Sequence, residues 1–482
     1  MRKKSLGINA FLNGIRSVIN VLFPLISFPY VSRVLSVDGI GIYNFSNTYV
    51  NYFVLIAGLG ISTYAVREGA KYRDNAQKIN VFSSQIFTIN IISTLVAYFL
   101  LFLTLFIFKN LSKYIVSILI FSLQILFTTI GTEWIYVIYE DFSYITIRSI
   151  VFKILSLVLL FLCVKNANDY LIYVGITVLA NVGSNFLNFI HAKKLCEIRI
   201  IKNTNWKKHL IPILIIFASS IATSIYVSSD TTILGLLKGN YAVGIYSVSI
   251  KIYTIAESLL GAIVVVMVPR LSLLIGQHKM KSFKSLLSDV IDDLLILVIP
   301  AATGLFLLSE DIILIIAGKK YVDSNNSLRI VCWTIILSVF NLIFSQCILI
   351  PAKKEGKVLK NTIITAFVNV LLNLILIPKF SYDGSAISTV ISEFLVMVLN
   401  CWDARSVTKS ILFSKYNLKN LIDSIIGSIG IILIYKVFLI NINSTWQRLI
   451  LTIIVSIVVY FLILLILKNN RIKNILKSFT IS

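Results

Sequence analysis

The chain has 482 residues, of which 57% are hydrophobic and 13% are charged, and its mean hydropathy is +0.90. Soluble domains carry about 45–50% apolar and about 25% charged residues, so this composition excludes a soluble globular enzyme. The same high apolar fraction excludes a disordered chain and a disulfide scaffold. The five cysteines are scattered without disulfide-like or metal-like spacing. The composition predicts an all-α polytopic membrane protein with no metal site and no cofactor.

Apolar runs long enough to span a bilayer, which takes about 20 residues, alternate with polar or basic breaks along the chain. We expect about 14 transmembrane helices, at 8–31, 42–65, 81–108, 114–138, 144–164, 171–190, 211–236, 243–268, 290–308, 328–350, 359–378, 384–401, 420–440 and 447–467. A further apolar stretch at 309–317 is too short to span and is expected to form an interfacial helix.

The basic residues of the loops predict the orientation, because cytoplasmic loops collect Lys and Arg. With the N-terminus inside, the predicted cytoplasmic segments hold 29 of the 44 Lys and Arg residues, and the external segments hold nine. Both termini are therefore expected in the cytoplasm, and the net charge of +23 is attributed to topology rather than to nucleic acid. No loop is long enough for a catalytic domain, and no GxxxxGK[ST] phosphate loop occurs, so neither an enzyme nor an ATP-driven pump is expected.

The chain contains an internal repeat. The triplet Gly-Ile-Tyr at 41–43 recurs at 244–246, an offset of 203 residues. The same offset relates Gly58 to Gly261 and Arg67 to Arg270. Since an offset of six helices preserves orientation, we expect two parallel six-helix lobes around a central cavity. The predicted parts are an N-lobe at 1–191 (helices 1–6), a basic cytoplasmic linker at 192–210, a C-lobe at 211–401 (helices 7–12), and helices 13–14 with a basic cytoplasmic tail at 402–482.

Charged side chains within a membrane span are costly and mark functional faces or ion pairs. Four cations are assigned to an anion-accepting cavity: Arg16, Arg148, Lys251 and Lys153. Polar stripes at helical spacing are expected to line the same cavity, with Asn13, Asn20, Asn47, Asn51, Asn185 and Thr254 as members. The alternative for the cations is an internal ion pair with Glu133, Asp230 or Glu257, or a stem that snorkels to the interface.

The same three carboxylates, Glu133, Asp230 and Glu257, are candidates for coupling transport to an ion. The first helix carries no carboxylate, and cavity cations favour an anionic cargo over a cationic drug. The three histidines, His191, His209 and His278, are assigned to basic loops and suggest no site.

Several motifs together resemble bacterial Wzx-type polysaccharide flippases, within the superfamily of multidrug, oligosaccharidyl-lipid and polysaccharide exporters. The resemblance covers about residues 5–400. The motifs are FPYVSRVL at 28–35, GIGIYNF at 39–45, Leu59-Gly60-Ile61 leading to Arg67-Glu68, Glu133-Trp134 before Tyr139-Glu140-Asp141, Ser229-Asp230, Ile233-Leu234-Gly235, Val243-Gly244-Ile245-Tyr246 and GSAISTVISE at 384–393.

This resemblance implies transport of undecaprenyl-diphosphate-linked oligosaccharide repeat units from the cytoplasmic to the outer leaflet by alternating access. The product would be capsule, exopolysaccharide or O-antigen. The implied location is the bacterial cytoplasmic membrane, and the implied partners are membrane lipid, a polysaccharide polymerase and chain-length machinery. The diphosphate would suit the cavity cations, and Arg33, Arg67 and Arg270 would serve at the rim or gate. The alternatives, in order, are a lipid II flippase and a cation-coupled multidrug exporter.

Overall fold

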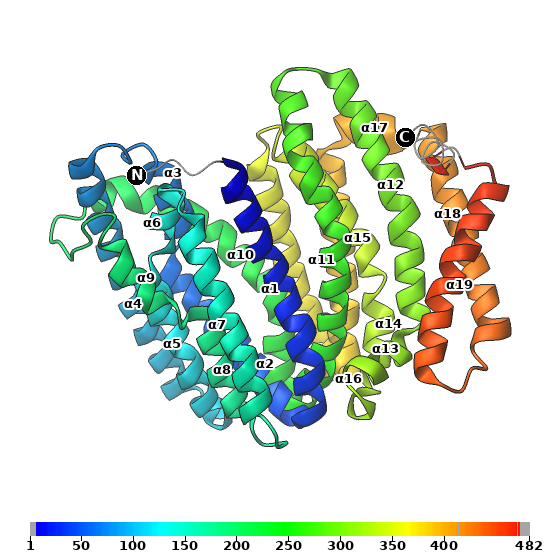
Figure 1. Ribbon diagram of the computed structural model, residues 1–482, viewed down its shortest axis with the longest axis horizontal. Coiled ribbons are helices and arrows are strands. Elements are labelled where there is room, and N and C mark those ends of the chain that lie inside the picture. Colours follow the sequence, from blue (N-terminus) through cyan, green and yellow to red (C-terminus); the bar gives the residue numbers. More distant parts are fainter. Residues whose placement is uncertain (1–5, 413, 470, 473–482) are drawn as a thin grey trace. The chain divides into compact units, whose positions relative to one another are not determined.

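The computed structural model describes residues 6–412, 414–469 and 471–472, without the side chains of 6–14, 16–18, 20–21, 410, 412 and 439. The described chain is helical and contains no strand (Figure 1). It divides into two compact units, with the boundary between Gly244 and Ile245. We refer to residues up to 244 as unit 1 and to the rest as unit 2.

Unit 1 contains α1 to α10 and the first turn of α11. The helices are α1 (Leu6–Val34), α2 (Val37–Gly58), α3 (Ile61–Gly69), α4 (Ala76–Ile107), α5 (Ile115–Gly131), α6 (Glu133–Ile138), α7 (Phe142–Cys163), α8 (Tyr170–Val182), α9 (Asn185–Ala192), α10 (Trp206–Lys238) and α11 (Asn240–Gly276), with a 3-10 turn at Lys109–Tyr114.

Unit 2 contains the rest of α11 and the helices α12 to α19. These are α12 (Met280–Leu307), α13 (Ser309–Ile316), α14 (Ser324–Val331), α15 (Thr334–Leu342), α16 (Glu355–Asp403), α17 (Arg405–Leu412), α18 (Lys415–Ile434) and α19 (Thr445–Ile466), with a 3-10 turn at Lys319–Tyr321 and π-helical turns at Ile343–Leu349 and Tyr435–Leu439.

The predicted membrane fold is confirmed. Twelve helical segments of the described chain are long and apolar enough to cross a bilayer. One of them, α16, contains two predicted spans, because Ser381 has a positive φ of 52° that breaks the helix. The two halves form an antiparallel hairpin, since Asn361 Nδ2 donates to Asn400 Oδ1 over 2.9 Å. With α1 over the first predicted span, each of the fourteen predicted spans has its helix.

The internal repeat has a counterpart in three dimensions within unit 1. A β-carbon at Gly41 would overlap the carbonyl oxygen of Asn240 and would lie 2.7 Å from its carbonyl carbon. A β-carbon at Gly244 would likewise overlap the carbonyl oxygen of Val37. Since 203 residues separate 37 from 240 and 41 from 244, the starts of α2 and α11 make reciprocal backbone contacts within unit 1. The repeated glycines therefore permit close packing of backbones.

The segment between α9 and α10, which belongs to the predicted linker, is bonded to α4. Ser84 Oγ donates to the Glu197 carbonyl over 3.3 Å, and the amide of Ile201 donates to Thr88 Oγ1 over 3.0 Å. The assignment of His191 and His209 to loops is wrong: His191 lies in α9 and His209 in α10. The imidazole of His209 is fully buried, with Tyr64 Oη 2.8 Å from Nδ1 and Gln85 Oε1 3.0 Å from Nε2.

In unit 2, α18 and α19, drawn orange and red in Figure 1, pack side by side, and contacts near both ends of α19 tie it to neighbouring helices. Near its start, Arg448 Nε donates to Asp311 Oδ2 of α13 over 2.8 Å. Beyond its end, Arg471 donates to both oxygens of Asp293 on α12 over 2.6 and 2.7 Å, and to Asp289 over 3.0 Å. These charge-assisted pairs are stronger than neutral hydrogen bonds and hold α19 in place.

Candidate functional site

The predicted cavity cation Arg148 is a buried charge in unit 1. It lies in the second turn of α7 and is only 7% exposed. Its Nε and Nη1 atoms are buried and have no hydrogen-bond partner in the described part of the chain. Burying an ionised group without a partner is unfavourable, so unpaired donors of this kind point to a ligand.

The arginine contacts one ring of a cluster of three nearly parallel aromatic rings. The guanidinium carbon of Arg148 lies 5.2 Å from the ring centre of Tyr144, within the range of a cation–π contact. The imidazole of His191 stacks on the same ring, with centres 4.0 Å apart and planes 16° apart. The ring of Tyr136 stacks beside both, with its centre 5.5 Å from that of Tyr144 and 5.8 Å from that of His191. Arg148 and His191, from α7 and α9, therefore share one aromatic ring.

Hydrogen bonds to the backbone of α9 hold the rings in place. Tyr136 Oη donates to the Asn188 carbonyl over 2.7 Å, and Tyr144 Oη donates to the Leu187 carbonyl over 3.3 Å. Tyr144 and Arg148 are four residues apart and so lie on one face of α7, a signal visible in the sequence. No local pattern pointed to His191, because its position in the cluster depends on how α9 packs against α6 and α7.

In unit 2, the predicted cavity cation Lys251 is half-buried in α11. No hydrogen bond or ion pair joins its Nζ to another residue of the described chain. The hydroxyl of Thr254 donates to the Lys251 carbonyl over 3.1 Å, so this predicted polar residue bonds its own helix. Lys251 therefore offers a partly desolvated positive charge to a ligand.

The remaining predicted polar residues occupy several environments. Asn185 is buried, and its Nδ2 donates to the Phe127 carbonyl over 3.1 Å, which fastens α9 to α5. Asn47 and Asn51 are half-buried on α2. The side chains of Asn13, Arg16 and Asn20 lie outside the described residues, although their backbone belongs to α1. Their role in a cavity stays a prediction.

The predicted rim and coupling residues are also dispersed. Arg33, Arg67 and Arg270 are exposed, and Arg67 Nε pairs with Glu68 over 3.3 Å. Lys153, Glu133 and Glu257 are half-buried, whereas Asp230 is only 5% exposed.

A polar pocket of about 350 Å³ lies in unit 1 beside the C-terminal end of α9. It is lined by Lys193, Lys194 and Arg73, and Arg73 pairs with Glu140 over 2.8 Å. Burial raises the pKa of the Cys196 thiol in the same lining, so this cysteine stays protonated rather than nucleophilic. This basic end of unit 1 is the one that the loop charges predict to be cytoplasmic.

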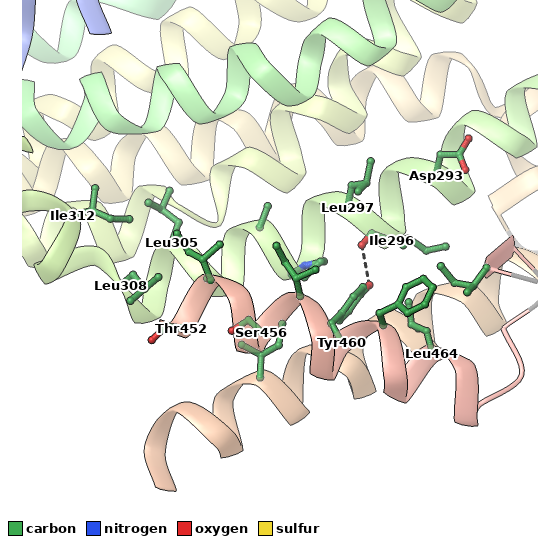
Figure 2. A pocket seen from close by; sticks show the side chains of 18 residues that line it. Asp293, Ile296, Leu297, Leu305, Leu308, Ile312, Thr452, Ser456, Tyr460 and Leu464 are labelled. Atoms are coloured by element: carbon green, nitrogen blue, oxygen red, sulfur yellow. Dashed lines mark hydrogen bonds between the residues drawn. The ribbon is translucent and has the colours of Figure 1, made fainter. Parts of the chain in front are cut away.

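Unit 2 contains a larger, apolar pocket of about 620 Å³. It lies among α12, α13, α18 and α19, and Figure 2 shows Leu297 and Leu464 among its lining side chains. The hydroxyl of Tyr460 is not available to a ligand, because it donates to the Ile296 carbonyl over 2.8 Å (Figure 2). With this lining, the pocket suits hydrocarbon better than sugar or phosphate.

The fold has counterparts among solved structures. The lipid II flippase MurJ in its inward closed conformation aligns with a TM-score of 0.76 over 94% of this chain and 98% of that chain. The two sequences are 16% identical, so this likeness establishes the fold alone.

Sequence comparisons add the family. The chain is 24% identical over 385 residues to a putative O-antigen transporter of Escherichia coli (strain K12), which covers 79% of this chain and 92% of that protein. It is also 24% identical over 394 residues to the capsular polysaccharide biosynthesis protein CapF of Staphylococcus aureus, covering 80% and 95%. Residues 6–275, more than half of the chain, match the model of a family described as polysaccharide biosynthesis protein. The resemblance to polysaccharide flippases is thus confirmed, and the chain belongs to the polysaccharide biosynthesis protein family.

Proposed function

We propose that the protein is a flippase that moves polyprenyl-diphosphate-linked oligosaccharide from the cytoplasmic to the outer leaflet by alternating access. The observation that carries the proposal is the buried guanidinium of Arg148, whose Nε and Nη1 lack partners among the described residues. A diphosphate would supply the missing acceptors with a multiply charged group. The family and the O-antigen transporter relative support a cargo of this class.

The other parts of such a cargo also have matching environments. Lys251 offers a second positive charge, in unit 2. The apolar pocket among α12, α13, α18 and α19 offers a surface suited to a polyprenyl chain. Both termini are placed in the cytoplasm on the basis of the loop charges, and the polymerase and chain-length machinery are proposed as downstream partners.

The proposal predicts a defined lipid phenotype in cells. Deleting the gene should cause polyprenyl-diphosphate oligosaccharide to accumulate in the cytoplasmic leaflet, because the lipid would still be made but no longer moved. Extracted lipid should be quantified and its leaflet determined, with a plasmid copy of the native gene as the control that restores the outer-leaflet pool.

Two other outcomes would overturn the proposal. Rescue of cells depleted of their lipid II flippase, with the oligosaccharide lipid unchanged by the deletion, would make lipid II the cargo. Unchanged lipid together with new sensitivity to cationic drugs would instead indicate a multidrug exporter.

A further inference from the structure

Three buried nitrogen atoms in unit 1 lack a hydrogen-bond partner in the described part of the chain: Nε and Nη1 of Arg148 and Nδ1 of His191. The two arginine atoms are obligate donors, and the imidazole Nδ1 becomes a donor when it is protonated. Both side chains contact the ring of Tyr144. The guanidinium carbon of Arg148 lies 5.2 Å from the ring centre, and the imidazole centre of His191 lies 4.0 Å from it. This part of unit 1 therefore has two unmatched arginine donors, and a third when His191 is protonated, which an anion with several oxygens would satisfy.

We propose that Arg148 and His191 form a proton-dependent binding site for a phosphate-type anion, and that it holds the diphosphate of the cargo during loading. The assignment of this anion to the cargo rests on the proposed function. The site lies in the second turn of α7 and the last turn of α9, next to the basic segment that carries Lys193 and Lys194. Its position suits capture of a headgroup from the leaflet that the loop charges place on the cytoplasmic side.

The charges around His191 make anion binding and protonation reinforce each other. The charged groups near His191 are Arg148 and Lys194, which are positive, and Asp141, which is negative. The phenol rings of Tyr136 and Tyr144 also stack on the imidazole. A bound diphosphate adds negative charge, so it favours protonation of His191, and by linkage protonation strengthens diphosphate binding.

The proton balance of the step is simple. A proton from solvent adds to Nδ1 of His191, and the new N–H donates to a phosphate oxygen while the guanidinium donates through Nε and Nη1. When the headgroup leaves, the imidazolium returns its proton to solvent. No bond within the diphosphate is formed or broken.

The test is calorimetric titration of the purified full-length protein with inorganic pyrophosphate at about pH 5 and about pH 8, well to either side of the ordinary histidine pKa of about 6.5. Arg148→Gln should weaken binding about tenfold or more at both pH values. Arg199→Gln, which removes an exposed arginine of the same unit, should leave binding unchanged. Equal binding by the native protein and Arg148→Gln would overturn the proposal.

The role of His191 is tested by comparing the native protein with histidine variants at each pH, because pyrophosphate itself changes its protonation over this pH range. Relative to His191→Gln, the native protein should bind about five- to tenfold more tightly at the lower pH and nearly equally at the higher pH. His191→Phe retains an aromatic ring for the stack but cannot be protonated. It should therefore show the same weaker binding at the lower pH, and it serves as the reference if His191→Gln folds poorly. A pH dependence that survives in His191→Phe would contradict the role of the imidazole.

The source of the anion is distinguished by competition. Farnesyl diphosphate, a short lipid-linked diphosphate, should displace pyrophosphate from the native protein. Failure to displace it would assign the site to free phosphate and overturn the link to the cargo. If the Arg148 and His191 variants flip the lipid normally, this site is refuted while the proposed function stands. If pyrophosphate binds as expected but the protein flips no lipid, the proposed function is refuted while the site stands.

Discussion

Replacing Gly41 by alanine is expected to destabilise the protein strongly, although the change adds one methyl group. The new β-carbon would overlap the carbonyl oxygen of Asn240, a backbone atom that no side-chain rotation can move. Overpacking at a tight contact costs about 1–3 kcal/mol of unfolding free energy, and more where backbone must shift. Gly244→Ala should behave similarly, because its β-carbon meets the carbonyl oxygen of Val37.

Gly175→Ala is the matched control. Gly175 lies inside α8, and no atom lies within 4 Å of a β-carbon built there. Because glycine in a helix interior is less favourable than alanine by about 0.5–1 kcal/mol, this variant should be as stable as the native protein or slightly more so. Thermal unfolding of the purified proteins in detergent measures the difference. Equal unfolding temperatures for Gly41→Ala and Gly175→Ala would show that the reciprocal contact of α2 and α11 is not tight.

Replacing Lys251 by glutamine is expected to reduce flipping of the oligosaccharide lipid about tenfold or more. A hydrogen bond to a charged group contributes about 1.5–3 kcal/mol, and about 1.4 kcal/mol corresponds to a factor of ten. The Nζ of Lys251 has no hydrogen-bond or ion-pair partner among the described residues, so removing its charge should leave the fold intact. The rate at which lipid-linked oligosaccharide reaches the outer leaflet measures this effect.

Two variants separate charge from packing. Lys251→Arg retains a positive charge at the same position and should restore much of the rate. Lys281→Gln removes an exposed lysine of the same unit and should leave the rate unchanged. If Lys251→Gln flips cargo at the native rate, the lysine does not contact the diphosphate.

The sequence predicted the membrane helices well because bilayer thickness sets a length that apolar runs reveal. The break in α16 was also predicted, since the run at 359–378 ends before the one at 384–401, and the structure places Ser381 between them. The Gly-Ile-Tyr repeat could be read from the sequence, whereas the close contacts of its glycines with Asn240 and Val37 are visible only in the structure.

The candidate site was only partly predictable. Arg148 could be identified because a cation in a membrane span needs an explanation. Its neighbours Tyr136 and His191 could not, because they come from separate helices and meet only through tertiary packing. For the same reason, the pairs of Arg471 with Asp289 and Asp293 left no local pattern, since 182 and 178 residues separate the partners.

The most direct test of the account is transport by the purified protein in liposomes that contain fluorescent polyprenyl-diphosphate oligosaccharide. We expect labelled lipid to become accessible to a membrane-impermeant quencher far faster than in protein-free liposomes, and more slowly with Arg148→Gln. Native protein that leaves the lipid as slow to cross as in empty liposomes would contradict the central claim that this chain itself moves the cargo.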